Sequence, residues 1–230
     1  MAEVLQFLPT LLLGVRVTVL VTVLGMIFSV VFALLGGLGR LSKRRPVRWL
    51  AGAYIEVFRG TSVLVQMFWL FYVFPRLFDI ELSPLFAGVL ALSMNVGAYG
   101  SEVVRGAILA VPKGQTEAAI ACNFSPSQRL RRIVLPQAVV AMLPPFGNLM
   151  IELLKGTALV SLITLSDLTF MAQQVRALTG ATLQIFTIVL VLYFVMSYAI
   201  TLGVRFLERR VSVGRDVGRH MPQPIPEPVA

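Results

Sequence analysis

Long apolar runs without a charged residue alternate along this chain with shorter polar segments. Four runs lack Asp, Glu, Lys and Arg altogether: 17–39, 82–101, 133–151 and 177–203. A helix of about 20 mostly apolar residues, rising about 1.5 Å per residue, crosses the hydrocarbon core of a bilayer. Each run is therefore predicted to contain a membrane-spanning helix.

A fifth apolar run, 60–74, is shorter and stops before Pro75. The segment before it, 49–58, is apolar except for Glu56. A longer helix that carries Glu56 near its aqueous end is therefore predicted here. Backbone groups in lipid must bond within the protein, and a helix does so along its own length. The expected fold class is an all-α, polytopic integral membrane protein with about five transmembrane helices.

Composition and charge agree with a membrane protein and indicate its orientation. Charged residues make up 13% of the chain, against about a quarter in soluble domains. Sixteen of the 20 Lys and Arg residues lie in 40–59, 102–136 and 205–219. The positive-inside rule places such segments in the cytoplasm, so an outside N-terminus, a cytoplasmic C-terminus and five crossings are predicted. The net charge of +9 thereby reflects topology rather than nucleic-acid binding.

Other segments have simpler interpretations. The first run is too long for a cleaved signal peptide and no cleavage site follows it, so a retained helix is expected. The basic turn at 40–48 is typical of an orientation signal and an anionic-lipid contact. Segments 74–84 and 166–182 are expected outside, the second with a surface helix. Residues 1–220 are expected to form a single transmembrane domain, and the proline-rich tail 221–230 to be disordered.

Metal and disulfide chemistry find little support in the sequence. Cys122 is the single cysteine, which excludes an internal disulfide, and His220 is the single histidine and lies in the polar tail. No metal site and no cofactor are expected in this chain. A membrane-embedded enzyme would need a cluster of His, Cys or carboxylates at depth, so this class of protein is disfavoured.

The segment 115–132 is polar and basic, and its local signals predict two helices joined by a tight corner. Glu and Ala favour a helix up to Cys122. Asn123 tolerates the left-handed conformation common after a helix end. Ser125 followed by Pro126 and Gln128 is typical of a helix start. Such a pair of helices is rigid enough to transmit a displacement.

This segment resembles the EAA loop of bacterial ABC importer permeases: Glu-Ala-Ala, three residues, Gly, nine residues, then Ile-x-Leu-Pro. Matching residues are Glu117, Ala118, Ala119, Ile133, Leu135 and Pro136, and Asn123 stands where the family has glycine. The resemblance implies a cytoplasmic coupling loop at about 106–136. The residues that it implies for contact with an ATPase are Glu117, Ala118, Ala119, Asn123, Arg129, Arg131 and Arg132.

Four further stretches, 54–68, 95–108, 111–119 and 155–163, are similar to motifs of the polar amino acid uptake branch of these permeases. Ser62 and Ala158 depart from the usual proline and serine. The resemblance covers roughly 10–210. It implies import of a polar amino acid or similar small zwitterion, possible ectoine-type solutes included, across a bacterial inner membrane by alternating access.

The resemblance also implies partners. These are a second permease, identical or related, two cytoplasmic ATPases that bind ATP and Mg²⁺, and an extracytoplasmic solute-binding protein. The chain contains no G-x-x-x-x-G-K-[ST] phosphate loop, which agrees with hydrolysis by a partner. A stand-alone channel or secondary carrier is the alternative, and it would need no docking loop.

Candidate pathway residues have two interpretations each. Asn95, Tyr99 and Glu102 recur on one helical face, either to meet a zwitterion or to make a polar helix–helix contact. Glu152 and Lys155 are three residues apart and hence on one face. Charges at membrane depth face a bundle interior or an aqueous cavity, so this pair either forms an internal ion pair or lines the transport pathway.

Overall fold

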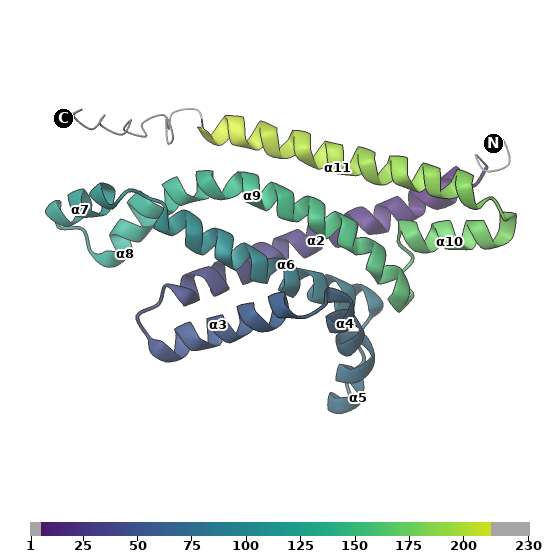
Figure 1. The fold of residues 1–230 in the computed structure, drawn as a ribbon, viewed down its shortest axis with the longest axis horizontal. Helices are drawn as coiled ribbons and strands as arrows, with labels where there is room; N and C mark the ends of the chain where they lie inside the picture. The colour runs from purple at the N-terminus through teal and green to yellow at the C-terminus, as the bar shows by residue number, and fades with distance from the viewer. Residues whose placement is uncertain (1–5, 213–230) are drawn as a thin grey trace, which may run out of the picture.

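Residues 6–212 are described by a computed structural model, and within them the chain forms helices and no strand (Figure 1). The expected tail at 221–230, the end of the expected domain at 220 and His220 lie outside the described residues. The elements are α2 (Leu8–Arg40), α3 (Arg45–Gly60), α4 (Val63–Phe68), η1 (Trp69–Val73), α5 (Phe74–Phe78), α6 (Pro84–Leu109), α7 (Lys113–Ala121), α8 (Pro126–Arg129), η2 (Leu130–Val134), α9 (Leu135–Gly156), η3 (Thr157–Ile163), α10 (Leu168–Thr179) and α11 (Thr182–Ser212).

Three helical stretches of the described chain are long and apolar enough to cross a membrane: Leu8–Arg40, Pro126–Ile163 and Thr182–Val211. A fourth is formed if the bent pair Arg45–Gly60 and Val63–Phe78 counts as one span. The all-α, multi-pass prediction is confirmed. The crossing predicted from the run 82–101 corresponds to α6. This helix spans about 39 Å at 1.5 Å per residue, but its glycines and polar residues lower its mean hydropathy. The count of five crossings therefore stays a prediction.

The long helix predicted from Trp49 onward is wrong, because it breaks between α3 and α4. The two halves meet at a bend of 106°, and Figure 1 shows α4 and α5 turning away from the long helices. Thr61 and Ser62 adopt extended backbone at the break, next to Gly60, whose missing side chain makes helix termination cheap. Ser62 has a φ of −68°, which a proline at this position would share.

Two short π-helical turns have a common cause in the prolines that follow them. Pro75 follows η1 and Pro136 follows η2. A proline has no N–H and its ring clashes with the carbonyl four residues earlier, so the hydrogen-bond ladder shifts. Phe74 donates instead to the Trp69 carbonyl and Leu135 to the Leu130 carbonyl, each five residues back. The helices therefore continue through these points without ending.

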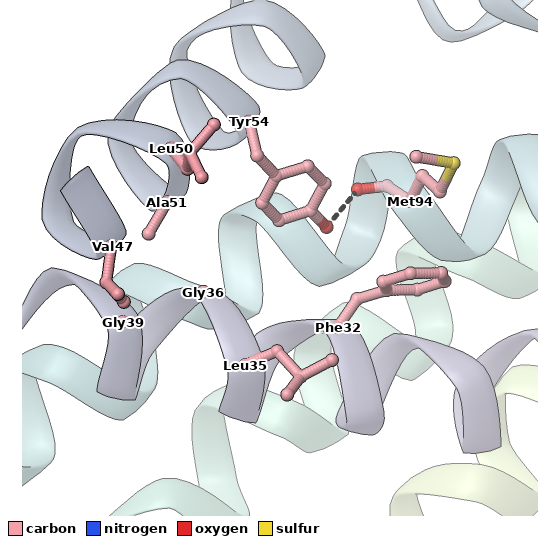
Figure 2. Close-up of a pocket in the computed structure, with 9 residues that line it drawn as sticks. All are labelled: Phe32, Leu35, Gly36, Gly39, Val47, Leu50, Ala51, Tyr54 and Met94. Atoms are coloured by element: carbon pink, nitrogen blue, oxygen red, sulfur yellow. Dashed lines mark hydrogen bonds between the residues drawn. The ribbon is translucent and has the colours of Figure 1, made fainter.

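Small residues let α2 and α6 pack closely along most of their length. A Cβ on Gly37 would lie 2.7 Å from the Cβ of Val104, which confirms that glycine here permits close helix approach. Tyr54 of α3 packs beside this contact between α2 and α6. Its hydroxyl donates to the Met94 carbonyl at 2.7 Å (Figure 2). An apolar pocket of about 380 Å³ lies beside Tyr54, between α2 and α3.

The surface helix expected within 166–182 is present as α10, and a buried carboxylate fixes its start. Asp167 is fully buried and accepts hydrogen bonds from the backbone N–H groups of Thr169 and Phe170 at 3.1 and 2.9 Å. The N–H of Leu168 donates to the Thr18 hydroxyl on α2 at 3.1 Å. Because Asp167 lies between the spans, outside both, its burial raises the pKa of its carboxyl from 3.8 to about 6.

This raised pKa predicts a pH dependence of stability. Between about pH 4 and pH 6 the folded protein binds the Asp167 proton more tightly than the unfolded chain does, so the free energy of unfolding falls as pH rises. Asp167→Asn keeps a capping oxygen but removes this cost. The thermal midpoint of the variant relative to wild type should rise from pH 4 to pH 7, by the equivalent of up to about 3 kcal/mol. An offset that is equal at both pH values would contradict this account.

Candidate functional site

The corner between α7 and α8 has the geometry that Asn123 predicts. Asn123 adopts a left-handed φ of 58°. Its N–H donates to the Ile120 carbonyl at 2.8 Å, and the N–H of Phe124 donates to the Ala119 carbonyl at 3.0 Å. These two bonds form a Schellman motif, which normally places glycine at this position. Asparagine is among the few other residues that accept this conformation, so the corner survives the departure from the family pattern.

The helix start predicted at Ser125 is also confirmed. The N–H of Gln128 donates to the Ser125 hydroxyl, and the N–H of Ser125 donates to the Gln128 side-chain oxygen at 2.9 Å. Pro126 occupies the first helical turn. From there the helix runs without interruption from Pro126 to Ile163. The corner is therefore joined directly to the long spanning helix.

The surface of α7 and α8 is open and charged. Glu117 and Ala118 of α7 are exposed, whereas Ala119 is buried against the following turn. Arg131 and Arg132 are exposed on η2. The structure thus presents one carboxylate and two guanidinium groups on a rigid corner.

Arg129 differs from its neighbours because it is only partly exposed. Its Nε is buried and has no hydrogen-bond partner among the residues described. A buried donor without a partner carries a free-energy cost. Within the described residues, the Nε atom of Arg129 is therefore left without a hydrogen bond.

Polar side chains satisfy the carbonyls freed by the break between α3 and α4. The Gln66 amide donates to the Phe58 carbonyl at 3.0 Å, to the Thr61 carbonyl at 3.2 Å and to the Thr61 hydroxyl at 2.7 Å. The Asn95 amide donates to the same Phe58 carbonyl at 2.7 Å and to the Gln66 side-chain oxygen at 3.3 Å. Asn95 thereby ties the break to α6, as the helix–helix interpretation of this residue expects.

The other members of the α6 face have partners of their own. Asn95, Tyr99 and Glu102 are all partly buried. The guanidinium of Arg59 lies 5.2 Å from the centre of the Tyr99 ring, within cation–π range. Glu102 pairs with Arg105, with 2.8 Å between the Glu102 Oε2 and the Arg105 Nη2. The face is polar and stretches from the break toward the α7 end of the molecule.

Glu152 and Lys155 do not form the ion pair that was one of their two interpretations. Glu102–Arg105 is the one ion pair within 4.0 Å among residues 6–212. Both Glu152 and Lys155 are exposed, on the face of α9 opposite to the buried Leu153. They have no hydrogen-bond partner in the described part of the chain.

The depth of these charges follows from the packing of α6 against α9. A Cβ on Gly100 would lie 3.2 Å from Phe146, and one on Gly156 would lie 3.2 Å from Leu92. The two helices therefore run antiparallel, and interpolation places Glu152 level with Asn95. Glu152 is therefore level with the middle of α6 (Pro84–Leu109), although it lies near the end of α9.

Three polar residues that belong to these features were not singled out from the sequence. Gln66 and Arg59 lie in the stretch 54–68, and the Gly-Thr-Ser sequence at 60–62 was the signal for a break that needs side-chain donors. Asn148 was hidden within the uncharged run 133–151. It is exposed on α9 four residues before Glu152, and helical spacing puts the two on one face.

Comparisons with known proteins point to transport. A model of the family described as binding-protein-dependent transport system inner membrane component matches residues 25–213. The probable amino-acid ABC transporter permease protein y4tF of Sinorhizobium fredii is 49% identical over 204 residues, which cover 86% of each chain. The L-cystine transport system permease protein TcyB of Bacillus subtilis is 39% identical over 90% of this chain and 88% of its own.

A solved structure agrees with these relatives. The crystal structure of an amino acid ABC transporter with histidines contains a chain that superimposes with a TM-score of 0.84 and 32% identity, over 91% of this chain and 97% of that one. The overall helix arrangement thus belongs to a fold already seen in an ABC transporter.

Substitutions at Asn123 test the corner. Asn123→Gly should leave it intact, whereas Asn123→Val should cost about 1–2 kcal/mol, since a β-branched residue resists the left-handed conformation. Hydrogen exchange at the amides of Asn123 and Phe124 reports this local loss directly. Equal protection in both variants would show that the corner does not depend on the residue type.

The shared carbonyl of Phe58 predicts coupling between two amides. Gln66→Leu and Asn95→Leu should each lower the free energy of unfolding by about 1–3 kcal/mol. The double variant should cost more than the sum, because only then is the Phe58 carbonyl left without either donor. Denaturation of the three variants and wild type in the same detergent measures the interaction energy. Simple additivity would mean that the carbonyl finds another partner.

Proposed function

This chain belongs to the family of binding-protein-dependent transport system inner membrane components, and we propose how it works as the permease subunit of an amino-acid ABC importer. A partner ATPase moves the corner between α7 and α8, and a polar amino acid or similar small zwitterion passes along polar side chains of α6 and α9. The chain is a multi-pass membrane permease and not itself an enzyme; ATP and Mg²⁺ are bound by the partner ATPases.

One observation carries the proposal: the docking corner and the exposed charges share a continuous helix. The stretch Pro126–Ile163 begins at the corner and contains Glu152 and Lys155. A displacement of a rigid helix at one end moves the other end with it. ATPase motion at the corner therefore reaches Glu152 and Lys155 along one helix without passing through a flexible loop, as alternating access by rigid-body motion requires.

The orientation in the membrane follows from the basic segments. Figure 1 shows α7 and α8 at one end of the long axis, the same end as the end of α11 and the turn between α2 and α3. The basic residues of 40–48, 129–132 and 205–210 therefore gather at that end. The positive-inside rule assigns this end to the cytoplasm, which puts α10 and the start of α2 outside, where the binding protein approaches.

The cargo pathway is inferred from charges that lipid does not tolerate. Glu152 and Lys155 are exposed in the isolated chain, yet Glu152 lies level with Asn95, near the middle of α6. Charges at this depth require water or protein around them. An aqueous cavity between this chain and a second permease supplies both, and a zwitterion finds a carboxylate and an ammonium group on the same helix face.

The relatives favour this account over the stand-alone channel or secondary carrier. Their names describe amino-acid and L-cystine permeases of transport systems. A carrier that works alone has no use for an exposed, preformed corner joined to a spanning helix. In an importer, the same corner is the site at which the ATPase docks.

A charge reversal on α7 tests the coupling. Glu117→Lys should weaken association with the ATPase partner by roughly tenfold, about 1.4 kcal/mol, and lower the ATP hydrolysis of the reconstituted importer. Co-purification and phosphate release measure the two effects. Glu81→Lys is the matched control, because Glu81 is equally exposed but lies outside the corner, before α6. Similar behaviour of both variants would rule out α7 as the docking site.

The function itself is tested by uptake. Proteoliposomes that contain this permease, its ATPases and its binding protein should accumulate radiolabelled L-cystine, L-glutamine or L-arginine when ATP is inside. Without hydrolysable ATP, accumulation should stop. If none of these amino acids is accumulated, the assignment to polar amino acid import fails.

A further inference from the structure

A polar pocket between α9 and α11 is left unused by the function described so far. It has a volume of about 200 Å³. Its lining includes Pro144, Asn148, Ile151, Thr201, Arg205 and Glu208. Four other pockets of the described chain are lined mainly by apolar side chains. A pocket that contains a cation, a carboxylate, an amide and a hydroxyl is therefore a distinct feature.

A close helix contact separates this pocket from the apolar interior. A Cβ on Gly147 would lie 2.7 Å from the Val204 side chain, so α9 and α11 touch there. On one side of this contact is an apolar pocket that Met142 and Phe146 help to line, and on the other is the polar one. The polar groups are thereby kept together on one side of the α9–α11 seam.

The two charges of the pocket are not used within the described chain. Arg205 and Glu208 are three residues apart on α11, yet they make no ion pair within 4.0 Å and no hydrogen bond with a residue in 6–212. Arg205 is exposed and Glu208 is partly buried. Opposite charges that share a pocket without meeting leave room for a group that bears both signs.

The pocket continues the charged face of α9. Pro144, Asn148 and Glu152 follow one another at a spacing of four residues, and all three are exposed. Because α9 rises from the corner at α8, Pro144 and Asn148 lie nearer the α7 end than Glu152 does. The pocket is thus the end of the same polar face on the side of the docking corner.

We propose that this pocket binds the transported zwitterion at the cytoplasmic end of its pathway, an inference that rests on the function proposed above. The Arg205 guanidinium pairs with the carboxylate of the amino acid. Glu208 accepts from its ammonium group, and Asn148 contributes an amide. The same chemistry fits the headgroup of a zwitterionic phospholipid, and the experiment below separates the two sources.

The test uses the complete importer in nanodiscs, without nucleotide, and the amino acid of the uptake panel that the wild type accumulates fastest. Equilibrium binding is measured for the wild type, Arg205→Gln, Glu208→Gln and Arg205→Lys. Both Gln variants should bind about tenfold or more weakly, since each loses a charge-assisted contact. Arg205→Lys keeps the charge and should bind better than Arg205→Gln. Arg210→Gln is the matched control, because Arg210 lies on the same helix over the Phe206 ring and outside the pocket.

Nanodiscs of phosphatidylglycerol alone and with phosphatidylethanolamine distinguish the ligand. Binding that is weakened in the Gln variants in both lipids supports the amino acid as occupant. Unchanged amino-acid binding, together with loss of retained phosphatidylethanolamine in native mass spectra of the Gln variants, would assign the pocket to lipid and overturn the proposal. Unchanged binding of both ligands would also overturn it. If uptake by the wild type is normal and the Gln variants bind the amino acid as the wild type does, the pocket assignment fails and the proposed function stands. If the wild type accumulates none of the amino acids, the proposed function fails first and this inference fails with it.

Discussion

A polar group in the hydrocarbon of a bilayer must find its partner in the protein or in water, and this requirement organises the whole structure. Where the chain breaks between α3 and α4, the carbonyls of Phe58 and Thr61 are met by amides of Gln66 and Asn95. Where α9 carries Glu152 and Lys155, no described residue meets them. In the first case the backbone carbonyls are satisfied within the protein. In the second case the charged side chains require water or a partner protein around them.

The same requirement explains how the corner and the pathway are connected. Prolines would normally end a helix, yet before Pro136 the ladder shifts to a π turn and the helix continues into α9. The helix therefore continues through this point without a hinge of loop residues. In the function proposed above, this continuous helix carries a displacement at the corner to the level of Glu152.

Local signals in the sequence predicted the features that local chemistry determines. Asn123 and the Ser125 box fixed the corner because a Schellman motif and a capping box involve residues within a few positions of each other. The uncharged runs located the spanning helices because the apolar character of a run is also a property of neighbouring residues. The break after Gly60 was missed, since the residue that stabilises it from α6, Asn95, is 37 positions away from Phe58. Spacing alone also could not decide whether Glu152 and Lys155 pair, because each side chain can turn toward water instead.

The candidate site residues fall into two groups: those with exposed side chains and those engaged in structural contacts. Glu117, Arg131 and Arg132 of the family motif lie on an exposed surface, which agrees with docking and leaves the partner to be demonstrated. Asn95 is engaged in a structural contact that holds the break against α6. The polar face of α9, with Asn148 added by the structure, is the surface to which the proposed function assigns the cargo.

The most direct measurement of this account is the accessibility of that face. In a Cys122→Ser background, Asn148→Cys or Glu152→Cys is placed in the reconstituted importer and treated with a membrane-impermeant maleimide from each side. The account predicts labelling from the cytoplasmic side without nucleotide and a shift to the opposite side when ATP analogues close the ATPases. No labelling from either side, or labelling that ignores nucleotide, would show that α9 faces lipid or a static contact and would contradict the account.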